Sequence, residues 1–513
     1  MNDNFEMVAK TFQGLEEVLA EELRNLGAEN VIPGKRMVAF EGNKELLYKA
    51  NLCCRTALRI LKPFYKFSAK DADSLYEQAK EYDWSQLLTI DKTFQIDTVA
   101  YSDEFSHSRF VTYRIKDAIV DWFKDRYGAD KRPGVRLVDA DVMINVHISG
   151  TDVTLSLDSS GESLHKRGYR VAQTEAPINE VLAAGILLRS GYRGDCPLVD
   201  PMCGSGTFLI EAAMIAANIN PGIYRRGFAF ERWKDFDADL FDSIFNDDSA
   251  EREPAYPICG ADISPKAIDI ARENIKSAGM AKYITLEVKP ISRWEEAPLP
   301  AGILVTNPPY GERISAPDMD ALYATIGNRL KNVFQGYHAW IIGYRDEYFA
   351  KIGLAASEKV PVLNGALECE LREYVIFEGD KKSFLKAGGK LKNHDTEQAD
   401  RTHKKNNKER RFRDSDERNE RRFKDSKERK FRDRDSISGD RKFKDRDARR
   451  HDDRHRKSVD RSDRYNSTEI QADSDNPLAL RRNPYALRSI QGKAPSLPKQ
   501  DGPIMRSRGW KKK

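Results

Sequence analysis

The 513-residue sequence has no uninterrupted apolar run that approaches the roughly 18 residues of a membrane span. Its first residues, MNDNFEMVAK, lack the basic segment and following apolar stretch of a secretory signal. These absences disfavour a membrane-spanning or secreted protein. They predict a soluble, cytoplasmic protein without a membrane partner.

Cysteine is scarce, with six residues at positions 53, 54, 196, 203, 259 and 369. None of them forms a Cys-x-x-Cys pair or a Cys/His spacing typical of zinc sites, so we predict neither a metal nor a disulfide framework. The sequence also lacks the Gly-Lys-Ser/Thr of a nucleotide-binding P-loop. This absence disfavours a nucleoside triphosphatase.

The charges nearly cancel, because 86 Lys and Arg stand against 81 Asp and Glu. This balance hides two unlike segments. Residues 381–513 hold 42 basic and 23 acidic residues (net +19), which leaves 44 basic and 58 acidic residues (net −14) for residues 1–380. A segment with so much charge and few aliphatic residues cannot bury enough apolar surface to fold. The sequence therefore predicts an acidic folded body and a disordered, basic, low-complexity tail over 381–513.

Residues 1–158 have the pattern of an α+β region. We expect a small βαβ-like unit over 1–45 and a second module over 46–158. The predicted elements are helices at 14–23, 44–57 and 109–123 and strands at 93–99, 142–148 and 152–157. Cationic side chains gather between residues 109 and 136, and they indicate either an RNA-binding patch or a solvated helix face.

Residues 165–380 alternate between strands and helices, which predicts a doubly wound parallel sheet. The predicted strands are 196–200, 257–262, 302–306, 338–343 and 374–377, and the predicted helices are 206–217 and 265–278. In such a sheet, ligands bind at the carboxyl ends of the strands.

A glycine-rich turn follows the first of these strands, in the run Asp200-Pro201-Met202-Cys203-Gly204-Ser205-Gly206-Thr207. The two glycines permit positive φ and close approach of a ligand, and the following helix offers free N–H donors. Asp262 ends the next strand, where its carboxylate can accept both hydroxyls of a ribose. It lies 56 residues beyond Gly206 instead of about 20, so we predict an insertion at 220–257.

The most specific motif is Asn307-Pro308-Pro309-Tyr310, directly after a buried strand. Two consecutive prolines stiffen the turn and hold the preceding Asn307 extended. The Asn307 carboxamide oxygen and the Pro308 carbonyl can then accept both protons of an exocyclic amine, and Tyr310 can stack on the attached ring. This arrangement directs the nitrogen lone pair at an electrophile by positioning and preorganised acceptors, without a strong base.

These motifs together resemble the class I S-adenosylmethionine-dependent methyltransferases that modify amino groups. The run LHKRGYR at 164–170, Ala176-Pro177, Glu180, the run DPMCGSGTFLIEAAMIA that begins at Asp200, and FAFERW at 228–233 are similar to the bacterial THUMP-domain RNA methyltransferases. The best-understood members of that family methylate N2 of a guanine in large-subunit ribosomal RNA. The resemblance covers residues 1–380 and implies a ferredoxin-like part at 1–45, an RNA-binding THUMP domain at 46–158 and a Rossmann-like methyltransferase domain at 165–380.

The resemblance also implies roles for individual residues. S-adenosylmethionine would be bound by the glycine-rich loop, by the acid that accepts the ribose hydroxyls and by Asn307. These cofactor-binding residues are Asp200, Pro201, Cys203, Gly204, Gly206, Thr207, Asp262 and Asn307. The target-amine pocket would be Asn307, Pro308 and Tyr310. The RNA-binding residues are expected from the cationic cluster between residues 109 and 136, and include Arg109, Arg114, Lys116 and Arg132.

Two positions depart from the family's pattern or invite another chemistry. Many members of this fold place an acid near position 290 for the adenine amine, whereas this chain has Pro290 and a neighbouring Glu287 that would point differently; backbone atoms would then serve adenine. Cys203 invites comparison with a nucleophilic cysteine. We reject that role, because a cysteine in the cofactor loop faces the methionine and amine transfer needs no covalent adduct.

Alternative functions share the same amine pocket. Adenine N6 methylation of nucleic acid and glutamine N5 methylation of protein would use it too, and a non-catalytic ribosome-assembly factor is a further possibility. We favour RNA guanine N2, with 23S rRNA or a large-subunit assembly intermediate as partner. The tail would add sequence-independent RNA affinity through phosphate contacts and stacking, or alternatively would only aid solubility.

Overall fold

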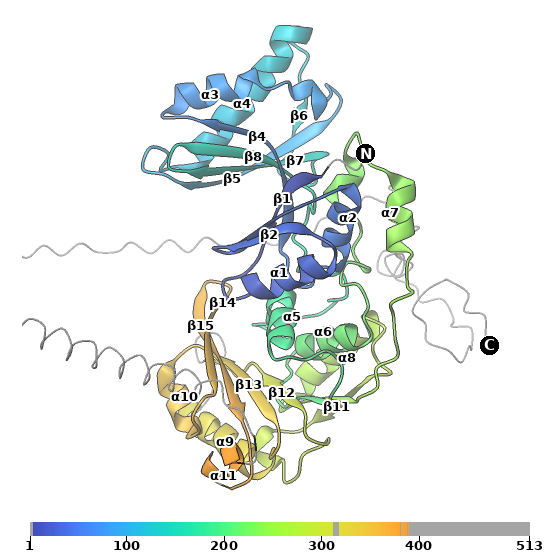
Figure 1. Cartoon of the computed structure of the whole chain (residues 1–513), viewed down its shortest axis with the longest axis vertical. Helices are drawn as coiled ribbons and strands as arrows, with labels where there is room; N and C mark the ends of the chain where they lie inside the picture. Colours follow the sequence, from blue (N-terminus) through green and yellow to red (C-terminus); the bar gives the residue numbers. More distant parts are fainter. Residues whose placement is uncertain (1–3, 311–317, 380, 387, 389–513) are drawn as a thin grey trace, which may run out of the picture. The chain divides into compact units, whose positions relative to one another are not determined.

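The computed structural model describes residues 4–310, 318–379, 381–386 and 388. An N-terminal sheet is formed by β1 (Phe5–Lys10), β2 (Glu29–Gly34), β3 (Met37–Gly42), β4 (Arg59–Ser68), β5 (Thr93–Tyr101), β6 (Gly134–Val135), β7 (Val142–Ser149) and β8 (Asp152–Asp158). Its helices are α1 (Glu16–Asn25), α2 (Lys44–Cys53), α3 (Ala72–Glu81) and α4 (Ser108–Tyr127), with a 3-10 turn at Trp84–Gln86. The strand order is β2-β3-β1-β4-β8-β7-β5-β6 (Figure 1).

The ten-residue strand β4 joins the two halves of this sheet. It pairs antiparallel with β1 through Arg59–Leu61 and with β8 through Leu61–Ser68. Buried residues of α2 share one core with those of α1 and β3, whereas α3 and α4 share another core with β5, β7 and β8. We therefore propose that the two modules divide within β4 and not at residue 45.

The C-terminal sheet consists of β9 (Leu198–Asp200), β10 (Ile258–Asp262), β11 (Ile284–Val288), β12 (Ile303–Thr306), β13 (His338–Gly343), β14 (Glu358–Asn364) and β15 (Leu367–Val375), in the order β11-β10-β9-β12-β13-β15-β14. Its helices are α5 (Glu180–Arg189), α6 (Thr207–Ala216), α8 (Pro265–Ser277), α9 (Met319–Asn332), α10 (Asp346–Ile352) and α11 (Lys381–Lys386), with a 3-10 turn at Ile291–Arg293. The insertion between α6 and β10 contains α7 (Ala238–Phe245) and a 3-10 turn at Ala229–Arg232, whose buried Phe and Ile residues belong to the core of α1 and α2.

The alternation of apolar residues along the strands assigns each face of this sheet to a different core. In β12, Ile303 and Val305 belong to the cluster that contains α5, α6 and α8, whereas Leu304 belongs to the cluster of α9 and α10. In β13, Trp340 and Ala339 divide in the same way. Side chains of a strand point alternately to opposite faces, so helices cover both sides of the sheet.

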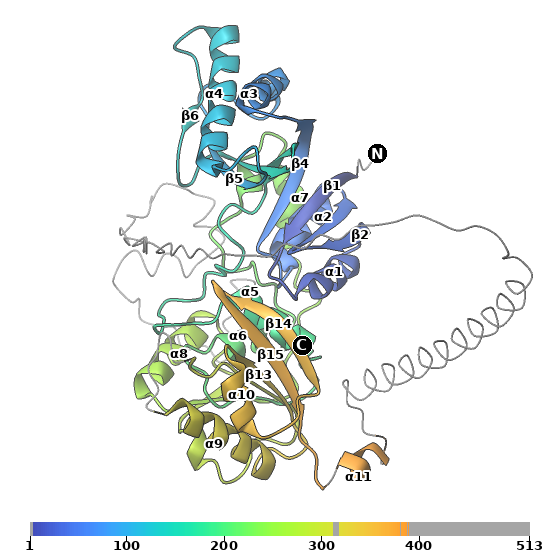
Figure 2. The same cartoon turned by 90° about the vertical axis from the view of Figure 1, so that its left-hand side faces the viewer.

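The prediction of a parallel sheet is correct for the strands from β11 to β13 and wrong for β15, which runs opposite to them. β15 is antiparallel to both β13 and β14 (Figure 2). Only Gly365 and Ala366 separate β14 from β15, and so short a connection can join only antiparallel strands. The sequence pattern had indicated no more than the end of β15.

The predicted insertion between the cofactor loop and β10 packs on the N-terminal modules. Phe230 stacks on Tyr48 of α2 with ring centroids 4.5 Å apart, and the Asp237 N–H donates to the Tyr48 hydroxyl at 3.0 Å. Lys92 of the second module donates to the Arg232 carbonyl at 2.6 Å. The insertion therefore connects the methyltransferase-like sheet to both halves of the N-terminal sheet.

Some predictions fall outside the described residues, namely the tail beyond residue 388 and Gly311 to Arg313 of the Asn-Pro-Pro-Tyr segment. Among the described helices, none combines the length and the hydropathy needed to cross a membrane. Over the same residues, no group of three or more His, Cys, Asp or Glu side chains could hold a metal ion.

Candidate functional site

The glycine-rich turn lies between the end of β9 and the start of α6. Gly206 has φ 81° and caps α6, and a Cβ there would lie 3.2 Å from the Ala271 Cβ. Gly204 has φ 53°, and a Cβ there would meet no protein atom within 4 Å. Both glycines are needed for the backbone conformation, and the open space beside Gly204 leaves room for a ligand.

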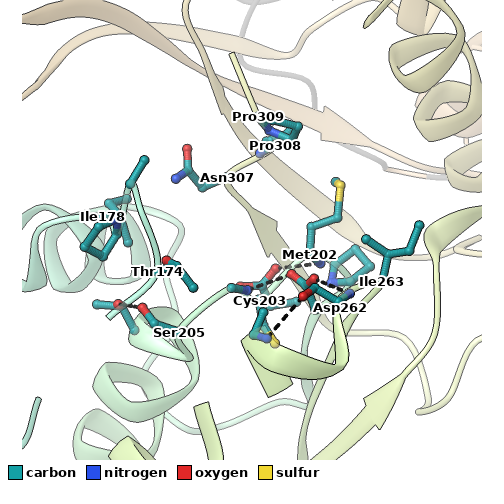
Figure 3. Close-up of a pocket in the computed structure, with 18 of the residues that line it drawn as sticks. Thr174, Ile178, Met202, Cys203, Ser205, Asp262, Ile263, Asn307, Pro308 and Pro309 are labelled. Carbon is teal, nitrogen blue, oxygen red and sulfur yellow. Dashed lines mark hydrogen bonds between the residues drawn. The ribbon is translucent and has the colours of Figure 1, made fainter. Parts of the chain in front are cut away.

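Asp262 ties this turn to the end of β10. Its two carboxylate oxygens accept hydrogen bonds from the Gly204 N–H at 3.0 Å and from the Ser264 N–H at 2.9 Å (Figure 3). Each oxygen retains a lone pair. The carboxylate is therefore fixed by main-chain donors and can still accept two hydroxyl groups.

Asp200 is buried at the base of the same turn, with 1% of its surface exposed. Its carboxylate accepts the Met202 N–H at 3.2 Å. Burial raises the pKa of Asp200 to about 7, since desolvation disfavours the charged form. A cationic ligand group at this position would favour the ionised carboxylate and lower that pKa.

Asn307 is held by side chains. The Tyr310 hydroxyl donates to the Asn307 carboxamide oxygen, and the Asn364 amide donates to the Tyr310 hydroxyl at 3.3 Å. Burial keeps the pKa of Tyr310 well above its usual range, so its hydroxyl remains a donor. The predicted stacking of Tyr310 on a substrate ring stays a prediction.

One cavity of about 710 Å³ brings the two motifs together. Figure 3 shows Asn307 and Pro308 on one side of this space and Asp262 with Ile263 on the other. Every predicted cofactor and amine-pocket residue lines the cavity except Gly206, which shapes the turn from behind. The predicted RNA-binding residues lie elsewhere, in and beyond α4.

Cys203 lines the cavity but does not have the properties of a nucleophile. Only 7% of its surface is exposed, and burial raises the pKa of its thiol well above the usual range. A thiol that stays protonated is a weak nucleophile. This burial agrees with the rejection of a covalent mechanism.

Sequence reasoning missed several walls of the cavity. The segment from Gln173 to Ile178, Ile291 with Ser292, and Asn364 with Leu367 all line it. Ala176-Pro177 was a usable signal for the first segment, because it contributed to the family resemblance. Nothing local marks Asn364, which reaches the site only through the β14–β15 hairpin.

The residues near position 290 supply an apolar wall and no acid. Pro290 lines the cavity, and Ile263 lines it with 70% of its surface exposed. Glu287 is exposed, lies outside the lining and pairs with Lys289 at 3.6 Å. This arrangement fits a flat aromatic group between apolar side chains, next to the ribose-type acceptor Asp262.

Two of the four predicted RNA-binding residues are exposed, and the other two form ion pairs with acidic side chains. Arg109 and Arg132 are exposed. Arg114 pairs with Asp73 at 2.9 Å, and Lys116 pairs with Asp117. Exposed aromatic side chains accompany them on α4, with Phe110 50% and Tyr113 61% exposed.

The cavity fits S-adenosylmethionine by its own chemistry. It combines a positive-φ glycine turn with open space, a carboxylate with two free lone pairs, an apolar slot at Ile263 and a buried acid at Asp200. The glycine turn matches the methionine backbone, and the carboxylate matches the ribose hydroxyls. The apolar slot at Ile263 matches the adenine ring, and the buried acid matches a cationic group of the ligand.

Three protein-family models match successive parts of the chain. They are an RlmL ferredoxin-like domain at residues 6–61, a THUMP domain at 69–158 and an RMKL-like methyltransferase domain at 167–373.

Curated relatives match the same region. The chain is 39% identical over 375 residues to a Synechocystis protein named "Putative RNA methyltransferase slr0064", covering 72% of this chain and 96% of that protein. It is 40% identical over 379 residues to the ribosomal RNA large subunit methyltransferase K/L of Syntrophotalea carbinolica, covering 71% of this chain and 53% of the relative. The chain therefore spans about half the length of the K/L enzymes it matches.

Solved structures agree in fold. One, described as "SMU.472, a putative methyltransferase complexed with SAH", is 32% identical with a TM-score of 0.66, and the match covers 74% of this chain and all of that chain. A possible methylase from Clostridium difficile 630 is also 32% identical, with a TM-score of 0.67 and the same coverage.

Proposed function

We propose that this chain, which belongs to the THUMP-domain family of S-adenosylmethionine-dependent RNA methyltransferases, transfers a methyl group to N2 of a guanine in 23S rRNA. The substrate would be the free RNA or a large-subunit assembly intermediate. The observation that carries the proposal is that one and the same cavity is lined by Asp262 and by Asn307 and Pro308.

S-adenosylmethionine supplies the methyl group on a sulfonium sulfur. The residues of this chain would bind the cofactor and orient the target amine. Asp262 would accept the ribose hydroxyls, and Asp200 and the Gly204 turn would face the methionine part. Asn307 and the Pro308 carbonyl would accept the two protons of the target amine, which would replace the Tyr310 hydroxyl on the Asn307 oxygen.

RNA would reach the site through the THUMP module. Arg109 and Arg132 are exposed, so they are free to contact phosphates, whereas Arg114 and Lys116 would first have to leave their acidic partners. The exposed Phe110 and Tyr113 could stack on unpaired bases. K/L relatives that carry a ribosomal RNA name support large-subunit RNA as the substrate class.

The test is to incubate the full-length protein with methyl-labelled cofactor and a mixture of ribosomal RNA, tRNA, DNA and protein. Each fraction is then separated, and the labelled product is identified by mass. We expect N2-methylguanosine in 23S rRNA, and label reduced by about 10²- to 10³-fold with Asn307→Ala. N6-methyladenine or N5-methylglutamine as the product would replace the guanine assignment, and cofactor binding without transfer to any fraction would favour a non-catalytic assembly role.

A further inference from the structure

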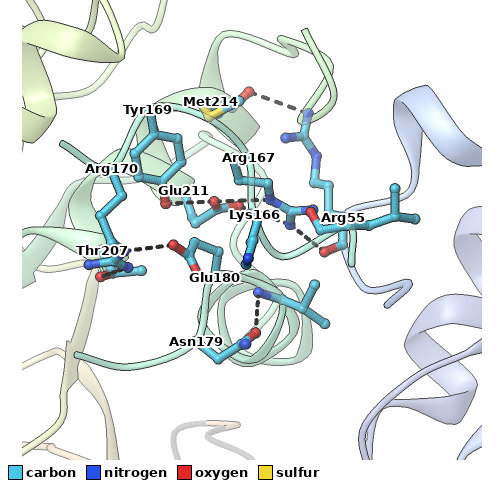
Figure 4. A network of polar contacts seen from close by, with 12 residues as sticks. Arg55, Lys166, Arg167, Tyr169, Arg170, Asn179, Glu180, Thr207, Glu211 and Met214 are labelled. Atoms are coloured by element: carbon cyan, nitrogen blue, oxygen red, sulfur yellow. Dashed lines mark hydrogen bonds and ion pairs between the residues drawn. The ribbon is translucent and has the colours of Figure 1, made fainter. Parts of the chain in front are cut away.

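Arg170 lies directly behind the cofactor turn and contacts it through side chains. Its Nη1 donates to the Ser205 hydroxyl at 3.0 Å, and its Nη2 donates to the Thr207 hydroxyl at 2.9 Å. Its Nε donates to Glu180 at 2.7 Å (Figure 4). One guanidinium therefore connects α5 to both residues that flank Gly206.

A buried asparagine holds the chain beside Arg170 to the same turn. Asn274 of α8 is fully buried, and its amide donates to the Ser205 carbonyl at 3.1 Å and to the Ala172 carbonyl at 2.9 Å. Its carboxamide oxygen accepts the Val171 N–H at 2.9 Å and the Ala172 N–H at 3.1 Å. The Asn274 side chain thus joins main-chain groups of the segment that carries Arg170 to a main-chain carbonyl of the turn.

The shape of the guanidinium matters more than its charge. Glu180 is 7% exposed and sits against Arg170, so much of the positive charge is already compensated. The planar fork, however, directs separate N–H groups at Ser205, Thr207 and the Ile178 carbonyl, the last at 3.4 Å. A lysine ammonium carries its three donors on one nitrogen and cannot span these acceptors.

Arg170 does not line the cavity, whereas Ser205 and Thr207 do. It therefore acts through the turn. Because the two hydroxyls accept from Arg170, their own protons point away from the guanidinium, and one hydroxyl can donate to the other at 3.5 Å. The start of α6 also leaves main-chain N–H groups without helical partners. The ligand group that faces such donors at the turn is the amino-acid end of the cofactor.

We propose that Arg170 is a positioning residue that fixes the Ser205 and Thr207 hydroxyls for the methionine carboxylate of S-adenosylmethionine. The proposal depends on the cofactor and not on which base is methylated. Cofactor binding without RNA therefore tests it separately from the proposed function.

The experiment compares two ligands of the full-length protein by calorimetry. S-adenosylhomocysteine carries the amino-acid end, and 5′-methylthioadenosine lacks it. For Arg170→Met, we expect the affinity for S-adenosylhomocysteine to fall about tenfold or more, with the affinity for 5′-methylthioadenosine changed less than about twofold. Equal loss for both ligands, or no loss for either, would overturn the proposal.

Two further variants complete the design. Arg225→Met is the matched control, because Arg225 is 5% exposed and donates to carbonyls at Ser163 and Lys166, away from the turn; we expect the ratio of the two affinities to stay at its wild-type value. Arg170→Lys keeps the stem and the pairing with Glu180, so it serves if the methionine variant fails to fold. It should show the same selective loss, and wild-type affinity for S-adenosylhomocysteine in this variant would contradict the proposal.

Discussion

The cofactor side of the cavity and its acceptor side are held in different ways. On the cofactor side, the main-chain N–H groups of Gly204 and Ser264 converge on Asp262. On the acceptor side, the Asn307 oxygen accepts from the side chain of Tyr310. Main-chain donors move only if the loop moves, whereas a side-chain donor can be exchanged for a substrate group. The cofactor side is thus preorganised, and the acceptor side has a contact that the target amine can take over.

The largest effect should come from Asn307→Ala, which removes the acceptor for the target amine. We expect methyl transfer to fall by about 10²- to 10³-fold, comparable to the loss of one preorganised polar group in other active sites. Binding of S-adenosylhomocysteine should stay within about twofold of wild type. Mass analysis of the nucleosides measures methyl transfer at the acceptor side, and calorimetry measures ligand binding at the cofactor side. Full activity of the variant would show that Asn307 has no role in the mechanism.

A smaller effect is expected from Asp262→Asn, which replaces a carboxylate by a group with one acceptor oxygen. We expect cofactor affinity to fall by about 10- to 100-fold, with kcat at saturating cofactor much less affected. Glu287→Gln is the control, because Glu287 is exposed and does not line the cavity. Comparable losses in both variants would mean that the ribose acceptor is not localised at Asp262.

The pH dependence of cofactor binding tests the buried acid. Burial raises the pKa of Asp200 to about 7, so folding favours the protonated carboxyl, and the cofactor-free protein should lose stability from this group as pH rises from about 4 to 7. A cationic ligand group prefers the ionised form, so affinity should rise about tenfold between pH 6 and pH 8. Calorimetry on wild type and Asp200→Asn checks this, since the asparagine variant should show a flat profile.

The smallest effect concerns the RNA surface. Replacing Arg109 and Arg132 together by alanine should weaken RNA binding a few-fold and reduce the slope of log affinity against log salt by about one for each arginine. Arg114 and Lys116, already paired with Asp73 and Asp117, should contribute less. Filter binding over a salt series measures the slope for the Arg109/Arg132 double variant and for a matching Arg114/Lys116 double variant. A larger slope change for the second pair would reverse the assignment.

Local chemistry made much of the site predictable. The acidic strand ends at Asp200 and Asp262, the glycines of the turn and the rigid Asn307 are properties of short segments, since allowed φ values and strand patterns depend on near neighbours. The same reasoning placed α1, α2, α4, α6 and α8 and seven of the strands within a few residues. It gave no bounds for α3, α5, α7, α9 and α10, for β1 to β4, or for β11. It failed for the β14–β15 hairpin, because strand direction depends on the connection and on the pairing partner.

The sequence by itself therefore determined the two reactive segments of this protein and the family they resemble. Only the tertiary structure decided what stands around them: Arg170 behind the turn, separated from Ser205 and Thr207 by 35 and 37 residues, and Asn364 against Tyr310, separated by 54 residues. Such contacts depend on the order of strands in the sheet and on the packing of helices against it. Neither is encoded in the spacing of neighbouring residues, so only the folded chain brings these groups together.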